Sequence, residues 1–200
     1  MTIIAAVDGP IRSARLRRDG NTMAARRLLG DAILIEHGRF DDDRGFFNQT
    51  YQAGELEQLL GRPLRLRQGN HSRSRRGVLR GFHLEPWDKL AYVVRGTAMF
   101  AVADLRVGSP TFRRAETVLL GDPPGRAARV FVPRGFANAF FCLTEVDYVN
   151  DVSEEFEPAN RHGIIWNDPT LDVKWPTIDP LLSASDRRLP TVAELFGRCP

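Results

Sequence analysis

The sequence predicts an all-β fold, either an antiparallel sandwich or a barrel, with little helix. Short apolar stretches alternate with polar residues, and this period of two is typical of β-strands. Gly and Pro residues separate the stretches, for example at Pro123-Pro124-Gly125 and Pro133-Arg134-Gly135. Many short strands divided by turns favour a sandwich or a barrel. In chain order, we expect strands at residues 32–35, 77–83, 90–94, 97–105, 117–120, 129–132, 137–143 and 146–152.

Two short helices are expected at the periphery. Residues 54–61 place three leucines on one helical face, and Gly61 suits the C-terminal end of such a helix. The segment Thr191-Val192-Ala193-Glu194 has the pattern of a capping box and opens a second helix near the end of the chain. The pair Arg95-Gly96, between two predicted strands, is a hairpin signal.

Length and composition indicate one globular domain with an extension. The chain has 200 residues, and six Arg against two Asp fall within residues 1–30, whereas the remainder is close to neutral. We therefore expect residues 1–22 to be a flexible, arginine-rich leader and residues 23–200 to form a single domain. A body of neutral charge gives no reason to expect a nucleic-acid partner. No apolar run approaches the roughly 20 residues that span a bilayer, so no membrane association is expected.

The cysteine content indicates the compartment. The chain has two cysteines, Cys142 and Cys199, which do not make a disulfide framework. Cys142 lies in an apolar strand and is expected to be a buried thiol. We see no secretion signal at the start of the sequence. These observations favour the reducing cytoplasm.

The most informative stretch is Gly77-Val78-Leu79-Arg80-Gly81-Phe82-His83. Arg80 and His83 are three residues apart, so a regular strand would point them to opposite faces, but a bulge at Gly81 would bring both to one site. A fixed cation beside a histidine suits anion binding combined with proton transfer. The alternative is a barrel strand with an incidental Arg and a hydrogen-bonded structural His.

Two further features leave alternatives open. Arg44 stands beside Phe46 and Phe47, where it would hold a phosphate or pair with the acidic run at residues 41–43. His83 and Glu85 are spaced as ligands on one strand face, but the later strands contain no second histidine, and Asn138 stands where one would be expected. We expect no metal, because the ligand count is too small for a mononuclear site.

Several motifs, taken together, resemble one known family, the dTDP-4-dehydrorhamnose 3,5-epimerases, which are cupin-type jelly-roll enzymes of deoxysugar biosynthesis. The resemblance covers residues 23–190 in family order. The matching segments are residues 43–47, 68–74, 77–83, 89–90, 102–106, 132–137, 163–169 and 183–186. The resemblance implies an antiparallel jelly-roll barrel with short peripheral helices, and a metal-free, cofactor-free homodimer that acts on a nucleotide-linked 4-keto-6-deoxyhexose.

Carried over residue by residue, the resemblance also implies roles. His83 would be the base that removes a proton beside the ketone, Asp186 its carboxylate partner, and Lys89 the cation that stabilises the enolate. The implied contacts to the diphosphate and nucleotide are Arg44, Gln68, Asn70 and Arg80, and those to the nucleotide base are Phe47 and Gln49. Phe156, which matches a second aromatic of the family, is a further implied substrate contact.

The sequence departs from the family pattern around the pocket. Asn150 stands at the position of the tyrosine that returns the proton from the opposite face, and an amide is not an acid. Tyr148, two residues earlier on the same strand face, is a candidate substitute. Asn138 replaces the histidine that helps hold phosphate. The segment from His83 to Lys89 is shorter than in the family and contains Trp87.

Three functions therefore remain open from the sequence. The first is epimerisation at C3, C5 or both, with Tyr148 or water as the acid. The second is a different proton transfer or a cyclisation on a carbonyl substrate in the same fold. The third is a non-catalytic jelly roll that binds sugar nucleotides, and the presence of His83, Asp186 and Lys89 argues against it.

Overall fold

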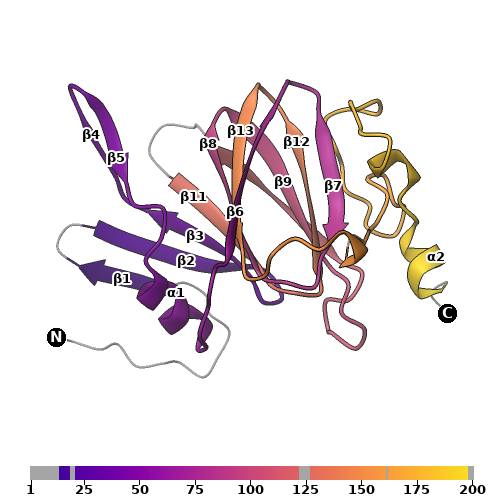
Figure 1. Cartoon of the computed structure of the whole chain (residues 1–200), viewed down its shortest axis with the longest axis horizontal. Helices are drawn as coiled ribbons and strands as arrows, with labels where there is room; N and C mark the ends of the chain where they lie inside the picture. The colour runs from indigo at the N-terminus through magenta and orange to yellow at the C-terminus, as the bar shows by residue number, and fades with distance from the viewer. Residues whose placement is uncertain (1–13, 19–20, 122–126, 161, 198–200) are drawn as a thin grey trace.

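The computed structural model describes residues 14–18, 21–121, 127–160 and 162–197, and these residues form two antiparallel sheets that face one another (Figure 1). In spatial order, the seven-stranded sheet contains β1 (Ala14–Arg18), β2 (Asn21–Leu29), β3 (Ala32–His37), β11 (Ala127–Val132), β8 (Lys89–Arg95), β13 (Val146–Val152) and β6 (Gln68–Ser74). The five-stranded sheet contains β10 (Ala115–Gly121), β9 (Thr97–Asp104), β12 (Phe136–Cys142), β7 (Leu79–Leu84) and β14 (His162–Gly163). The predicted all-β jelly roll is thus confirmed.

The remaining elements lie outside the two sheets. Strands β4 (Arg39–Asp42) and β5 (Gly45–Asn48) form a separate hairpin, the arm, which projects from the body at the upper left of Figure 1. Helix α1 (Ala53–Leu60) ends at Gly61 in the left-handed conformation, as predicted. The short helices η1 (Pro158–Asn160), η2 (Asp186–Arg188) and α2 (Val192–Phe196) belong to the C-terminal segment, and α2 opens with the predicted capping box at Thr191. In the described part of the chain, no helix is long and apolar enough to cross a membrane.

The core has three layers because the sheets bury both faces. Strand β12 is buried along its whole length. Its Phe136, Phe140 and Cys142 pack between the two sheets, whereas Ala137 and Ala139 face the C-terminal segment. The outer face of the seven-stranded sheet carries a third cluster, to which α1 contributes Leu56. Asn138 alternates with Ala137 and Ala139 and is therefore directed to the interior.

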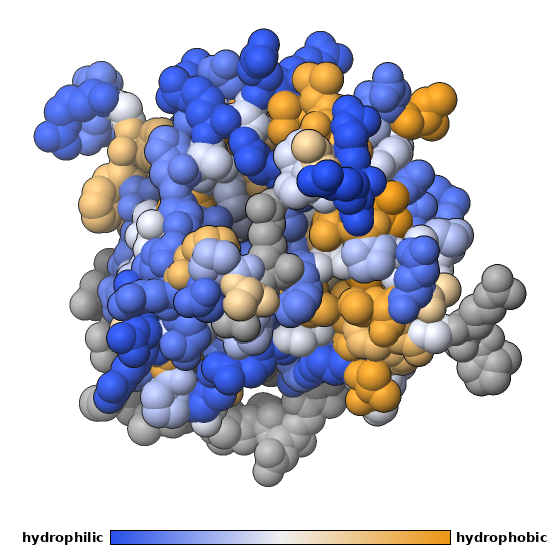
Figure 2. Space-filling view, turned by 45° about the vertical axis from the view of Figure 1, so that its right-hand side comes forward, coloured by the Kyte–Doolittle hydropathy of each residue, from blue (hydrophilic) through white to orange (hydrophobic). Residues whose placement is uncertain are grey.

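The C-terminal segment is attached along β7 and closes the outer face of the five-stranded sheet. Leu181 accepts a hydrogen bond from Leu79 N and donates one to Gly77 O, at 3.0 and 2.8 Å. The buried Asp168 carboxylate accepts from the backbone N–H groups of Leu171 and Val192, at 3.1 and 2.8 Å. Figure 2 shows apolar side chains gathered on the right-hand side of the molecule, where this segment lies. The contacts fix the segment that carries Asp186.

Two expectations differ from the structure. Arg95-Gly96 does not form a hairpin, because β8 and β9 lie in different sheets and the chain crosses between them at Gly96. Each strand finds its partners elsewhere, β8 in β11 and β13, and β9 in β10 and β12. The leader was expected to be flexible throughout, but its residues 14–18 pair with β2. This strand lacks an alternating apolar pattern, and its backbone hydrogen bonds to β2 at the sheet edge stabilise it instead.

Strand β7 contains the bulge that the sequence predicts at Gly81. His83 pairs with Asn138 and Arg80 pairs with Phe140, so three steps along β7 match two steps along β12. The extra residue reverses the side-chain alternation, and Arg80 and His83 consequently line the same cavity. Gly81 has a φ of 107°, and a Cβ at this position would lie 2.5 Å from the Asn138 carbonyl oxygen. Only glycine fits here.

We predict that Gly81→Ala lowers the free energy of unfolding by at least about 2 kcal/mol, because left-handed strain and a backbone clash add. Gly108→Ala is the matched control, since Gly108 also has a positive φ but open space at its Cβ. The control should lose only about 1 kcal/mol. Urea unfolding of both variants provides the measurement, and equal losses would contradict the role of the clash.

Candidate active site

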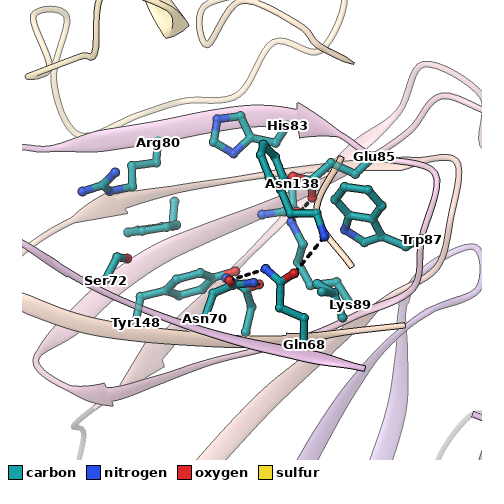
Figure 3. A pocket seen from close by; sticks show the side chains of 14 residues that line it. Gln68, Asn70, Ser72, Arg80, His83, Glu85, Trp87, Lys89, Asn138 and Tyr148 are labelled. Atoms are coloured by element: carbon teal, nitrogen blue, oxygen red, sulfur yellow. Dashed lines mark hydrogen bonds and ion pairs between the residues drawn. The ribbon is translucent and has the colours of Figure 1, made fainter. Parts of the chain in front are cut away.

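A cavity of about 320 Å³ opens between the two sheets and contains most of the residues that the sequence singles out (Figure 3). Strands β7 and β12 form one wall, and β6, β8 and β13 form the other. The lining residues are Gln68, Asn70, Ser72, Arg80, His83, Glu85, Trp87, Lys89, Asn138, Phe140, Tyr148, Asn150, Val152 and Phe156. Polar side chains thus converge from both sheets on one space.

His83 is paired with a buried carboxylate. Its Nε2 lies 3.0 Å from Asp186 Oδ1, although 103 residues separate the two in the sequence. Asp186 begins η2, and its backbone N–H donates to Ser183 Oγ at 3.0 Å, which fixes the turn that presents the carboxylate. When Nε2–H donates to Asp186, the lone pair of the neutral imidazole is on Nδ1. The pair is therefore arranged to accept a proton.

Lys89 provides a cation inside the cavity. Its ammonium donates to Asn138 Oδ1 at 2.9 Å and lies 2.5 Å from Glu85 Oε2. The Lys89 side chain is 8% exposed, so the charge is largely shielded from water. In such surroundings an ammonium stabilises a developing negative charge more strongly than it does in bulk solvent. Lys89 and His83 come from opposite walls.

Arg80 and a ladder of amides line the rest of the cavity. Arg80 Nε donates to Ser74 Oγ at 2.9 Å. Gln68 Nε2 donates to Asn70 Oδ1 at 2.7 Å, and Asn70 Nδ2 donates to Asn150 Oδ1 at 3.1 Å. At the other end of this row of amides, Gln68 Oε1 accepts a hydrogen bond from the backbone N–H of Phe156 at 2.8 Å. The ladder thus connects Asn150 to the half-exposed ring of Phe156.

Tyr148 stands next to Asn150 on the wall opposite His83. Its ring stacks on Phe140, with 4.3 Å between centroids. Burial raises the pKa of the Tyr148 hydroxyl well above its ordinary value, the negative charge of Glu85 raises it further, and a hydrogen bond with the Asn150 side chain opposes both effects. Tyr148 therefore stays protonated at neutral pH, and its hydroxyl is coupled to Asn150.

Three predicted substrate contacts lie away from this cavity. Arg44, Phe47 and Gln49 belong to the arm or follow it, and none of them lines the cavity. Arg44 pairs with Asp42 at 2.6 Å, which is the alternative that the acidic run suggests, and Phe47 is 69% exposed. Within one chain, these residues do not meet His83.

The structure also adds lining residues that sequence reasoning did not assign to the site. Every second residue of a strand faces the same side. Ser72 therefore faces the cavity with Gln68 and Asn70, and Val152 faces it with Tyr148 and Asn150, so the alternation could have identified both. Glu85 was considered only as a metal ligand. In the described residues, no group of three or more His, Cys, Asp or Glu side chains is placed to hold a metal ion.

Comparison with known proteins identifies the family. Residues 27–194 match the family model described as dTDP-4-dehydrorhamnose 3,5-epimerase. The chain belongs to this family. It is 41% identical over 170 residues to the dTDP-4-dehydrorhamnose 3,5-epimerase of Pseudomonas aeruginosa. The aligned region covers 82% of this chain and 93% of that relative. The prediction of an enzyme, a carbohydrate epimerase with a cupin-type jelly roll, is thereby confirmed.

Two solved structures are similar along most of the chain. The first is NovW, a 4-keto-6-deoxy sugar epimerase from the novobiocin gene cluster of Streptomyces spheroides, with a TM-score of 0.81, 35% identity and coverage of 90% of this chain and 92% of NovW. The second is ChmJ, a 3'-monoepimerase from Streptomyces bikiniensis in complex with dTDP-quinovose, with a TM-score of 0.78, 34% identity and coverage of 85% and 88%.

Proposed function

We propose that this enzyme epimerises a dTDP-linked 4-keto-6-deoxyhexose at C3, C5 or both. The observation that carries the proposal is the placement of a His–Asp pair and a buried lysine on opposite walls of one cavity. A proton next to a ketone is removed at a useful rate only when a base and a charge that stabilises the enolate act together. The relatives named above act on sugars of this class.

In the proposed reaction, His83 accepts the proton from the carbon next to the ketone. The electron pair of the broken C–H bond moves to the ketone oxygen, and Lys89 donates a hydrogen bond to the resulting enolate. Asp186 holds the imidazole and stabilises the imidazolium that forms. Return of a proton to the same carbon from the other side inverts its configuration.

We propose Tyr148 as the group that returns this proton. His83 comes from β7 and Tyr148 from β13, so the two side chains reach a bound sugar from opposite sheets. Asn150 has no acidic proton, but its hydrogen bond with Tyr148 favours the phenolate that proton transfer leaves behind. Asn150 thus supports the acid that replaces the tyrosine expected at its own position.

The remaining polar groups suit the nucleotide part of the ligand. Arg80 is the cation that remains for the diphosphate, because Lys89 is paired with Glu85. Gln68 and Asn70 supply amide groups near Phe156, whose half-exposed ring is available to stack on the base. Asn138 accepts from Lys89 through Oδ1, which leaves its NH₂ group for the ligand.

A homodimer explains the exposed arm. Phe40, Phe46 and Phe47 are all exposed in the single chain, and such apolar side chains on a projecting hairpin are typical of an interface. We propose that the arm packs on a second copy and brings Arg44, Phe47 and Gln49 to the mouth of its cavity. We also propose a cytoplasmic location, because Cys142 is a free buried thiol.

Deuterium exchange tests the base. The wild-type enzyme in heavy water should incorporate deuterium at C3 or C5 of dTDP-4-keto-6-deoxyglucose, as followed by NMR. His83→Ala should lower the exchange rate by about 10²- to 10⁴-fold while dTDP binding and the unfolding midpoint remain near wild type. Retained exchange in this variant would exclude His83 as the base. Absence of exchange in the wild type would favour another carbonyl substrate or a binding function.

Inversion and exchange separate the acid from the base. Tyr148→Phe should keep deuterium exchange but lose most of the inverted product, because only the proton donor is removed. Asn150→Tyr in this background should restore inversion if position 150 addresses the same face of the sugar. Full inversion by Tyr148→Phe alone would show that water or another residue is the donor.

The arm prediction concerns oligomeric state. Phe46→Asp with Phe47→Asp should convert the dimer to a monomer and raise the Kd for dTDP, measured by light scattering and calorimetry. Val107→Asp is the control, because Val107 is even more exposed than the two phenylalanines but lies outside the arm. A monomeric wild type, or a dimeric variant with unchanged dTDP affinity, would contradict the proposal.

A further inference from the structure

Glu85 places a carboxylate inside the cavity, directly beside the cation of the proposed reaction. Its Oε2 lies 2.5 Å from Lys89 Nζ, and the two side chains are 17% and 8% exposed. Lys89 also donates to Asn138 Oδ1 at 2.9 Å. An ammonium has three N–H donors. Glu85 and Asn138 therefore occupy two of them, which leaves one for a ligand.

The charge of Glu85 opposes the proposed chemistry. A carboxylate next to a forming enolate raises the energy of the enolate. The same charge contributes to the raised pKa of Tyr148 and so weakens the acid. An electrostatic benefit to the substrate therefore does not explain this residue.

Geometry offers the explanation. A lysine side chain has a flexible four-carbon stem, and fixing it in one conformation costs rotamer entropy. Lys89 is rooted in β8 of the seven-stranded sheet, whereas Asn138 lies on β12 of the other sheet and Glu85 follows β7. The two acceptors thus hold the ammonium from the wall opposite its own backbone, on the side where His83 stands (Figure 3).

We propose that Glu85 is a positioning residue. This inference rests on the proposed function. With Asn138 it holds the Lys89 ammonium so that the remaining N–H faces the ketone oxygen of the sugar. Glu85 positions the ammonium because its oxygen atom accepts a hydrogen bond. The negative charge of Glu85 is not needed for this positioning. Glu85 therefore acts on the chemical step and leaves nucleotide binding unaffected.

Two substitutions distinguish position from charge. Glu85→Ala removes the acceptor and should lower kcat for deuterium exchange by about 10- to 100-fold, with little change in the Kd for dTDP. Glu85→Gln keeps an oxygen acceptor without the charge and should recover most of the rate. If Glu85→Gln is as slow as Glu85→Ala, or if Glu85→Ala keeps the wild-type rate, the positioning role is wrong.

A double-mutant cycle tests whether Glu85 acts through Lys89. In the Lys89→Met background, Glu85→Ala should cause no further loss of exchange, whereas independent effects would add. Glu155→Gln is the charge control, because Glu155 pairs with Arg67 at the surface next to Phe156, and it should keep the wild-type rate. Additive losses in the cycle would overturn the inference. A wild-type enzyme without exchange would instead contradict the proposed function itself.

Discussion

The site depends on one extra residue in β7. Without the bulge at Gly81, Arg80 and His83 would point to opposite faces of the five-stranded sheet, and the cavity would contain only one of them. The bulge requires a residue that adopts a φ of 107° with no room for a Cβ. Glycine alone satisfies both conditions, so a local backbone constraint determines where the Arg80 and His83 side chains meet.

A second constraint, which is long-range in the sequence, completes the His–Asp pair. The C-terminal segment crosses the outside of the five-stranded sheet, and the backbone N–H and C=O of Leu181 attach it to Gly77 and Leu79 at the start of β7. Asp168 holds the start of α2 from within the same layer. These contacts place η2 so that Asp186 reaches His83. The same contacts that stabilise the segment therefore also orient the His83 imidazole.

Sequence reasoning reached those features that local chemistry determines. The alternation of apolar and polar residues identified most strands, and Gly81 indicated the bulge. Gly61 marked the end of α1, and Thr191 marked the start of α2. It was wrong at Arg95-Gly96, because a glycine between two strands indicates a turn but not which sheet the second strand joins. The partnership of His83 with Asp186 came only from the family resemblance, since nothing local relates residues 103 positions apart.

The pairing of Glu85 with Lys89 was missed for a different reason. The segment between them was recognised as short, but the sequence does not show which side chains the short turn brings together. In the structure, the turn from β7 to β8 brings the Lys89 ammonium to the Glu85 carboxylate. Sequence reasoning noted only that Glu85 is spaced from His83 as a metal ligand would be, and it expected no metal there. A nearby ammonium meets the same electrostatic need.

The two-sheet architecture separates the two halves of the proposed reaction. His83 and its carboxylate partner belong to the five-stranded sheet and the segment behind it, whereas Tyr148, Asn150 and Lys89 belong to the other sheet. A change on β13 therefore alters how the proton is returned without disturbing how it is removed. Such a separation allows the tyrosine expected at position 150 to be replaced by Asn while the base, its carboxylate and the cation are all retained. In the proposed reaction, the outcome at each carbon then depends on the seven-stranded wall, which carries Tyr148 and Asn150.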